Sequence, residues 1–105
     1  MTSPSDGNEI LDIATRAFIA PFDAVLMLDV TDGAPIWVDG RSDPPLAALE
    51  APADAAVTCA WRASERAMKR ILDGERAIES AYVSGRLVVA GDMSVMARIK
   101  VEKTR

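Results

Sequence analysis

The stretch Asp73–Ile99, DGERAIESAYVSGRLVVAGDMSVMARI, decides the fold of this chain. It contains three predicted elements that meet at two glycine-marked corners. Arg76–Val83 has the apolar spacing of a short helix, Arg86–Ala90 has the composition of a strand, and a last helix follows Asp92, which is placed to cap it. No nucleophile is paired with a base in this stretch. A segment so well specified in shape and so poor in reactive groups favours a protein that holds an apolar molecule over one that transforms it.

Upstream of this stretch, the sequence predicts two longer helices. Apolar residues at helical spacing predict a first helix over Glu9–Ala20, with Asn8 as its N-cap and Pro21 after its end. Ser64 is the predicted N-cap of a second amphipathic helix, which Gly74 ends. Both helices have one apolar face, so we expect both to pack against a common core.

Four predicted strands complete the chain, and hairpin signals separate some of them. The strands are Phe22–Val30, Pro35–Asp39, a short edge strand within Leu46–Leu49, and Asp54–Trp61. The continuous apolar run of the first strand favours a central position in a sheet. Asp32-Gly33 predicts a tight turn with positive φ angles between the first two strands. At the other end of the chain, charged and apolar residues alternate over 98–102, as they would in a strand. The last helix and a strand therefore both stay open as alternatives there.

Composition excludes several classes of function. A chain of 105 residues with 50% hydrophobic residues is long enough to fold as one domain around its own core. It has one cysteine and no histidine, so we expect no disulfide, no metal site, no cofactor and no histidine general base. No basic region followed by an apolar run opens the chain, and no apolar run approaches the ~18 residues of a membrane-spanning helix, so we expect a soluble cytoplasmic protein.

Charge is distributed unevenly along the chain. The net charge is −4, but residues 1–56 carry ten acidic and two basic side chains, whereas residues 57–105 carry six acidic and ten basic ones. The acidic total argues against nucleic acid as a partner. The basic second half is suited to an anionic partner or ligand headgroup.

The run from Asp54 to Ile99 resembles the sterol carrier protein type 2 family of small lipid-transfer domains. The matching features are an Ala-Asp pair that opens a strand at Ala53-Asp54, a polar start before an aliphatic helix that ends in glycine, and a small-aromatic pair at Ala81-Tyr82 followed by a glycine. The strongest match is the block Gly85–Met93, GRLVVAGDM, which is similar to the family's glycine, basic residue, strand, glycine, Asp or Asn, and Met. The first half agrees more loosely.

The resemblance implies an α/β or, more closely, an α+β fold. We expect a five-stranded, mostly antiparallel sheet in the order 3-2-1-4-5, with helices packed on one face and the last strand beside the fourth. The resemblance also implies that this chain has an apolar tunnel between the sheet and the C-terminal helices. We expect residues 1–7 to be a mobile N-terminus and residues 8–105 to form a single sterol-carrier-like domain.

A set of apolar residues forms the predicted ligand site. The methionines lie on apolar faces, and flexible thioethers adapt to ligands of varied shape. These same residues would equally serve as ordinary core, and that alternative stays open. The set consists of Met27, Trp37, Met68, Leu72, Ile78, Tyr82, Leu87, Val89, Met93 and Met96. Within it, Ile78, Tyr82, Met93 and Met96 are expected to form one end of a pocket whose floor is Leu87 and Val89.

Four basic residues form a second candidate site. Arg62, Arg66, Lys69 and Arg70 have the spacing of one helix face. They would contact an anionic membrane or a lipid headgroup, or they would form an ordinary solvated face. Cys59 is expected to be a buried small hydrophobe.

We therefore expect a non-enzymatic carrier that binds or transfers a fatty acyl chain, a sterol-like molecule or another lipid. No residue is assigned a catalytic role. The alternative is an accessory or dimerisation domain that presents hydrophobic substrates to an enzyme partner or packs against it. Brief contact with a membrane surface and a homodimer both remain open.

Overall fold

A computed structural model describes residues 6–54, 56–74 and 77–99. The elements follow one another as helix α1 (Asp6–Ala17), strands β1 (Val25–Val30), β2 (Ile36–Asp39), β3 (Leu46–Ala48) and β4 (Cys59–Ala63), helices α2 (Glu65–Leu72) and α3 (Ile78–Val83), strand β5 (Val88–Gly91) and helix α4 (Ser94–Arg98). The chain therefore has the α+β character that the sequence predicts.

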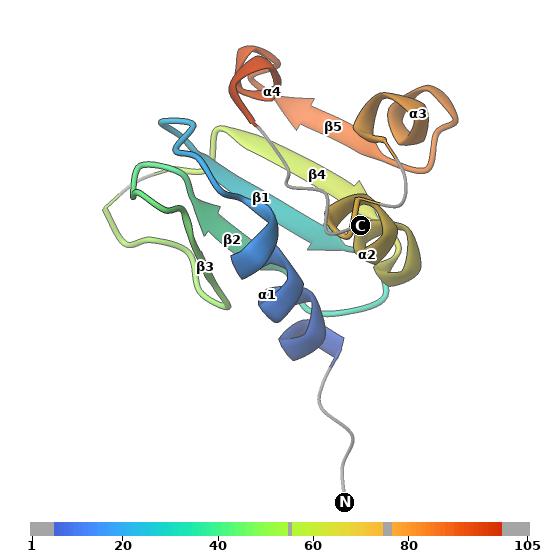
Figure 1. The fold of residues 1–105 in the computed structure, drawn as a ribbon, viewed down its shortest axis with the longest axis horizontal. Helices are drawn as coiled ribbons and strands as arrows, with labels where there is room; N and C mark the ends of the chain where they lie inside the picture. The colour runs from blue at the N-terminus through green and yellow to red at the C-terminus, as the bar shows by residue number, and fades with distance from the viewer. Residues whose placement is uncertain (1–5, 55, 75–76, 100–105) are drawn as a thin grey trace, which may run out of the picture.

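The five strands form one sheet in the order β3-β2-β1-β4-β5, as the family resemblance implies. Three neighbouring pairs are antiparallel, and the central pair β1 and β4 is parallel. Figure 1 shows α1 and α2 lying across one face of this sheet, with α3 and α4 beside β5. The prediction of a mostly antiparallel sheet covered by helices on one face is confirmed.

The core lies between the sheet and the helices. Strand residues alternate between this layer and the opposite face, so Leu26 and Leu28 of β1 are fully buried while Met27 between them is only partly buried. Helix α2 buries Met68, Ile71 and Leu72 through its apolar face, as the sequence predicts. Its N-cap is Ser64, whose Oγ accepts the Ala67 N–H at 3.2 Å.

Several element boundaries differ from the sequence prediction. Helix α1 spans Asp6–Ala17 rather than Glu9–Ala20, so Asn8 lies inside the helix and is not its N-cap. Pro21 disfavours helical conformation in the residue before it, which agrees with the earlier end. Strand β4 begins at Cys59 rather than Asp54, because its registered pairs with both neighbouring strands start there, with Leu26 of β1 and Gly91 of β5.

The turn between β1 and β2 is also different from the prediction. Neither Asp32 nor Gly33 has a positive φ angle, and a loop over residues 31–35 replaces the tight turn. Asp32 is used elsewhere, since its Oδ1 accepts the backbone N–H of Glu65 at the start of α2 at 2.7 Å. This hydrogen bond attaches the loop after β1 to the start of α2.

The C-terminal corners follow the predicted pattern. Gly74, Gly85 and Gly91 all have positive φ angles, between 80° and 95°, which glycine adopts without steric cost. Helix α4 contains Arg98, which favours the helical alternative for this position, and residues 100–102 lie outside the described residues. Of the predicted N-terminal segment, residues 1–5 are also outside them, while residues 6 and 7 belong to α1.

Candidate functional site

Six of the predicted apolar site residues lie on the helix side of the sheet. Met68 and Leu72 in α2 and Leu87 before β5 are almost fully buried in the core. Ile78 in α3, Val89 in β5 and Met96 in α4 are partly buried and pack against that core. The structure thus brings together residues from the two C-terminal helices and the strand between them.

Trp61 is the side chain around which this region is organised. It is fully buried, faces the helix side of β4, and pairs with Val89 across the sheet. Its indole Nε1–H points at the Met96 sulfur, with 2.9 Å between the nitrogen and the sulfur. On another side its ring packs at a tilt against Phe18, with 6.0 Å between the ring centroids. A central tryptophan therefore joins α4 to the main core.

Trp61 is not among the ligand-site residues that the sequence predicts. The signal that could have identified it is strand parity, because Cys59, Trp61 and Ala63 alternate with more exposed residues toward the helix side. Its contact with Met96 joins positions 35 residues apart and depends on tertiary packing alone.

Two predicted site residues lie on the opposite face of the sheet. Met27 and Trp37 are direct partners in the β1–β2 register, and Met27 also faces Ala60 in β4. Directly paired residues point to the same face of a sheet, so Met27, Trp37 and Ala60 share one face. The neighbouring positions Leu28, Ile36 and Trp61 point to the other face and are buried. The structure therefore does not bring Met27 and Trp37 together with the other eight residues.

The remaining two predicted residues are half exposed. Tyr82 in α3 and Met93 at the N-cap position of α4 expose 49% and 48% of their surface. Val83, the last residue of α3, exposes 84%. Apolar side chains on α3 and α4 therefore face outward beside the partly buried Ile78, Val89 and Met96.

Few residues anchor α3 and α4 to the rest of the molecule. Ala81 is the fully buried residue of α3, and Val95 is the buried residue of α4. Helix α4 gains one further attachment, because Arg98 Nε donates to the Phe22 carbonyl oxygen at 2.9 Å. Elements with so few buried contacts open at lower free energy than central strands.

Asp92 fixes the start of α4. Its Oδ1 accepts the Ser94 N–H at 2.9 Å and the Ser94 Oγ–H at 2.7 Å. The hydrogen bond from the Ser94 side chain is the main reason that the pKa of Asp92 lies below its ordinary value, and the Ser94 backbone N–H lowers this pKa further. Asp92 therefore orders this corner as a carboxylate from the position before the N-cap residue Met93, so the prediction that Asp92 itself is the N-cap is wrong.

The basic residues occupy a different part of the surface. An open groove of about 680 Å³ is lined by Asp32, Glu65, Arg66, Lys69, Arg70 and Arg86. Three of the four predicted basic residues are in this lining. Arg62 is not, because it lies in β4 before the helix begins and its Nε donates to Asp29 Oδ2 at 3.0 Å. The sequence analysis missed Arg86, which reaches the groove from the corner between α3 and β5.

Cys59 has the buried position that the sequence predicts. Cys59 is buried, and burial raises the pKa of its thiol, with a smaller contribution from the Asp92 charge. Among the described residues, no three His, Cys, Asp or Glu side chains lie together in a way that would hold a metal ion. No helix within those residues is both long enough and apolar enough to span a membrane.

The sequence of this chain is similar to that of a known protein family. A family model described as the SCP-2 sterol transfer family matches residues 8–101. Among curated protein sequences, none matches the chain.

Similar folds occur in solved structures. The sterol carrier protein domain 2 of Helicoverpa armigera is similar with a TM-score of 0.69 and 11% identity, over 92% of this chain and 86% of that one. Sterol Carrier Protein 2 from Yarrowia lipolytica, in its apo form, has a TM-score of 0.60 and 15% identity, over 75% and 70% of the two chains. The sec-alkyl sulfatase PisA1 has a TM-score of 0.61 and 13% identity, over 91% of this chain and 15% of the sulfatase.

Proposed function

Because this chain belongs to the SCP-2 sterol transfer family, we propose that it is a non-catalytic carrier that binds the apolar part of a lipid between its sheet and helices α3 and α4. Membership of the family supports lipid binding and transfer in general. The position of the ligand is our inference from the side chains of this chain. We assign the ligand contact to Ile78, Tyr82, Val89, Met93 and Met96, with Trp61 and Leu87 beneath them.

One observation carries this assignment. Tyr82 in α3 and Met93 at the start of α4 expose about half of their surface, and each of these two short helices has a single fully buried residue. Exposing apolar side chains on weakly anchored helices has a free-energy cost that a bound apolar molecule would remove. The partly buried Met96 and Val89 beside them extend the same apolar surface toward Trp61.

The chemistry of these residues suits a ligand without fixed shape. Methionine has three rotatable bonds and a polarisable sulfur, so Met93 and Met96 can adjust to chains or rings of different outline. Burial of ten ligand methylenes would contribute about 8 kcal/mol before the cost of association is subtracted. Burial of the apolar part of the ligand is therefore the main favourable contribution that we propose for this site.

The proposal is tested by looking for lipid in protein purified without delipidation. We expect native mass spectrometry to detect added lipid mass and an organic extract to contain that lipid. Removal of the lipid should lower the melting temperature, because a ligand that binds only the folded state stabilises it. An identical melting curve after extraction, together with an extract that contains no lipid, would contradict the proposal.

The same measurement addresses the alternative of an accessory or dimerisation domain. That alternative predicts a ligand-free protein of defined oligomeric mass. A carrier instead shows lipid mass on the protein whatever its oligomeric state.

A further inference from the structure

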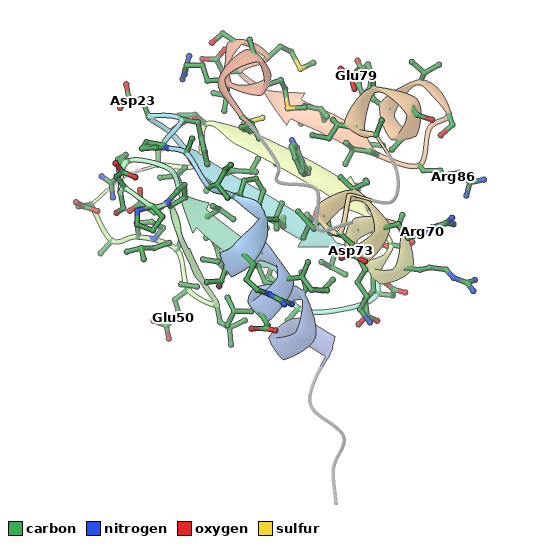
Figure 2. The ribbon with its side chains drawn as sticks, viewed as in Figure 1. Asp23, Glu50, Arg70, Asp73, Glu79 and Arg86 are labelled. Atoms are coloured by element: carbon green, nitrogen blue, oxygen red, sulfur yellow. The ribbon has the colours of Figure 1, made fainter. Side chains whose placement is uncertain are left out.

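We propose that the groove between α2 and the α3–β5 corner is a binding site for a phosphate group, separate from the apolar site. The groove lining carries four cationic side chains, Arg66, Lys69, Arg70 and Arg86, and two acidic ones. Arg86 lies in the corner between α3 and β5, whereas the other three cations lie in α2. Figure 2 shows Arg70 and Arg86 extending toward the same side of the molecule.

The two acidic residues in the lining are already engaged by the protein. Asp32 Oδ1 accepts the Glu65 backbone N–H at 2.7 Å. The Glu65 carboxylate is largely covered, and its Oε2 lies 3.5 Å from Lys69 Nζ. These contacts hold the start of α2 and leave the excess positive charge of the lining to face the groove.

Two of the cations have no protein partner within the part of the chain that the structure describes. Within the described residues, the guanidinium groups of Arg66 and Arg86 make no hydrogen bond or ion pair, and both side chains are exposed. Elsewhere on the surface Arg16, Arg41 and Arg62 each pair with a carboxylate. The contrast points to Arg66 and Arg86 as the cations of the groove that are available to an outside anion.

The chemistry of these groups specifies the anion. A guanidinium presents a planar fork of N–H donors that matches two oxygens of a phosphate, and such charge-assisted pairs are roughly twice as strong as neutral hydrogen bonds. Two arginines from separate elements, with Lys69 and Arg70 adjacent, can satisfy several phosphate oxygens at once. The groove is open, so the rest of the molecule that carries the phosphate can remain outside it.

This inference does not depend on the proposed lipid site. The groove lining is entirely charged, whereas the apolar site is formed by α3, α4 and the helix side of β5. A phosphate in the groove could belong to the headgroup of an amphiphile or to a free phosphate compound. The chemistry of recognition is the same in both cases.

The test is a titration followed by the backbone amide NMR spectrum of the full chain. Inorganic pyrophosphate is the free phosphate probe, and dihexanoyl phosphatidic acid below its micelle concentration is the headgroup probe. We expect shifts at residues 64–70 and 85–87 and weaker binding at high salt. The double variant Arg66→Gln, Arg86→Gln should weaken binding by about tenfold or more.

The matched control is Arg16→Gln, which removes a positive charge from α1, where Arg16 pairs with Asp12. It should leave the affinity within about twofold, because screening limits the effect of a distant charge. All three substituted side chains are exposed, so the variants should retain the wild-type melting temperature.

The outcomes separate the two sources of phosphate and the two proposals. Binding of pyrophosphate alone assigns the groove to a free phosphate compound, and binding of both probes assigns it to a headgroup as well. Equal affinity in the wild type and the double variant, or shifts only outside the groove, would overturn the phosphate site. Dihexanoylglycerol, which lacks phosphate, reports on the apolar site independently.

Discussion

At the scale of single residues, Gly91 has much less space for a side chain than Gly85 has. It pairs with Cys59 across the β4–β5 ladder and has a φ angle of 95°. A Cβ atom at this position would lie 2.5 Å from the Thr58 carbonyl oxygen. That same oxygen accepts the Asp92 N–H at 2.8 Å, so it cannot move away without loss of this hydrogen bond.

We therefore expect Gly91→Ala to lower the free energy of unfolding by about 2 to 4 kcal/mol, through left-handed strain and the backbone clash together. The matched control is Gly85→Ala. Gly85 also has a positive φ angle, but a Cβ there would meet nothing within 4 Å. Gly85→Ala should lower the free energy of unfolding by about 1 kcal/mol or less, because the reduced freedom of the unfolded chain offsets part of the strain. Urea unfolding measures both variants, and equal losses would show that the Thr58 contact is unimportant.

At the scale of secondary-structure elements, α4 depends on a short set of contacts. Val95 is buried, Met96 contacts Trp61, and Arg98 bonds the Phe22 carbonyl oxygen. The Asp92 carboxylate orders the first turn. A five-residue helix is too short to be stable alone, so each of these contacts affects whether it forms.

The depressed pKa of Asp92 sets the sign of a pH effect on α4. The carboxylate contributes its full stability above the ordinary aspartate pKa of about 4, and that contribution is lost as the pH falls through the lower pKa of the folded state. We expect hydrogen-exchange protection factors in α4 to fall below about pH 4 while those of β1 and β4 persist.

Asp92→Asn is the control for this acid effect. The asparagine carbonyl oxygen can still accept from Ser94 but does not titrate. Protection of α4 in this variant should therefore be independent of pH in the same range. Acid sensitivity equal to that of the wild type would assign the effect to another group.

The sequence predicted the elements more accurately than their ends. Local signals such as the Ser64 cap and Gly74 depend on neighbouring residues and were confirmed. The predicted start of β4 was wrong because strand ends depend on the register with neighbouring strands, which here starts where Cys59 pairs with Leu26 and Gly91. Such pairing is not encoded in the local pattern.

At the scale of the whole molecule, the sheet has two unequal faces. The helix side carries the buried row that includes Leu28 and Trp61, and the other side carries the partly buried row of Met27 and Trp37. The sequence identified both tryptophans as apolar residues in strands. It could not assign their faces relative to the C-terminal helices, because that depends on how β4 and β5 enter the sheet beside β1.

The two tryptophans offer a test of where a lipid binds. In a Trp37→Phe variant the fluorescence comes from Trp61, and in a Trp61→Phe variant it comes from Trp37. We expect an added fatty acid to change the Trp61 emission and to leave the Trp37 emission unchanged. A response confined to Trp37 would place the ligand on the opposite face of the sheet and contradict the proposed site.

The parallel pairing of β1 with β4 has a consequence for biosynthesis. The three strands β1, β2 and β3 and helix α1 leave the ribosome first, and β4 joins β1 only after a connection of 28 residues, 31–58, has been made. Helix α3, strand β5 and helix α4 emerge later still. Because these last elements carry most of the proposed lipid site, the site cannot form before they have been synthesised, so we expect a lipid to be loaded onto the completed chain and not onto the nascent one.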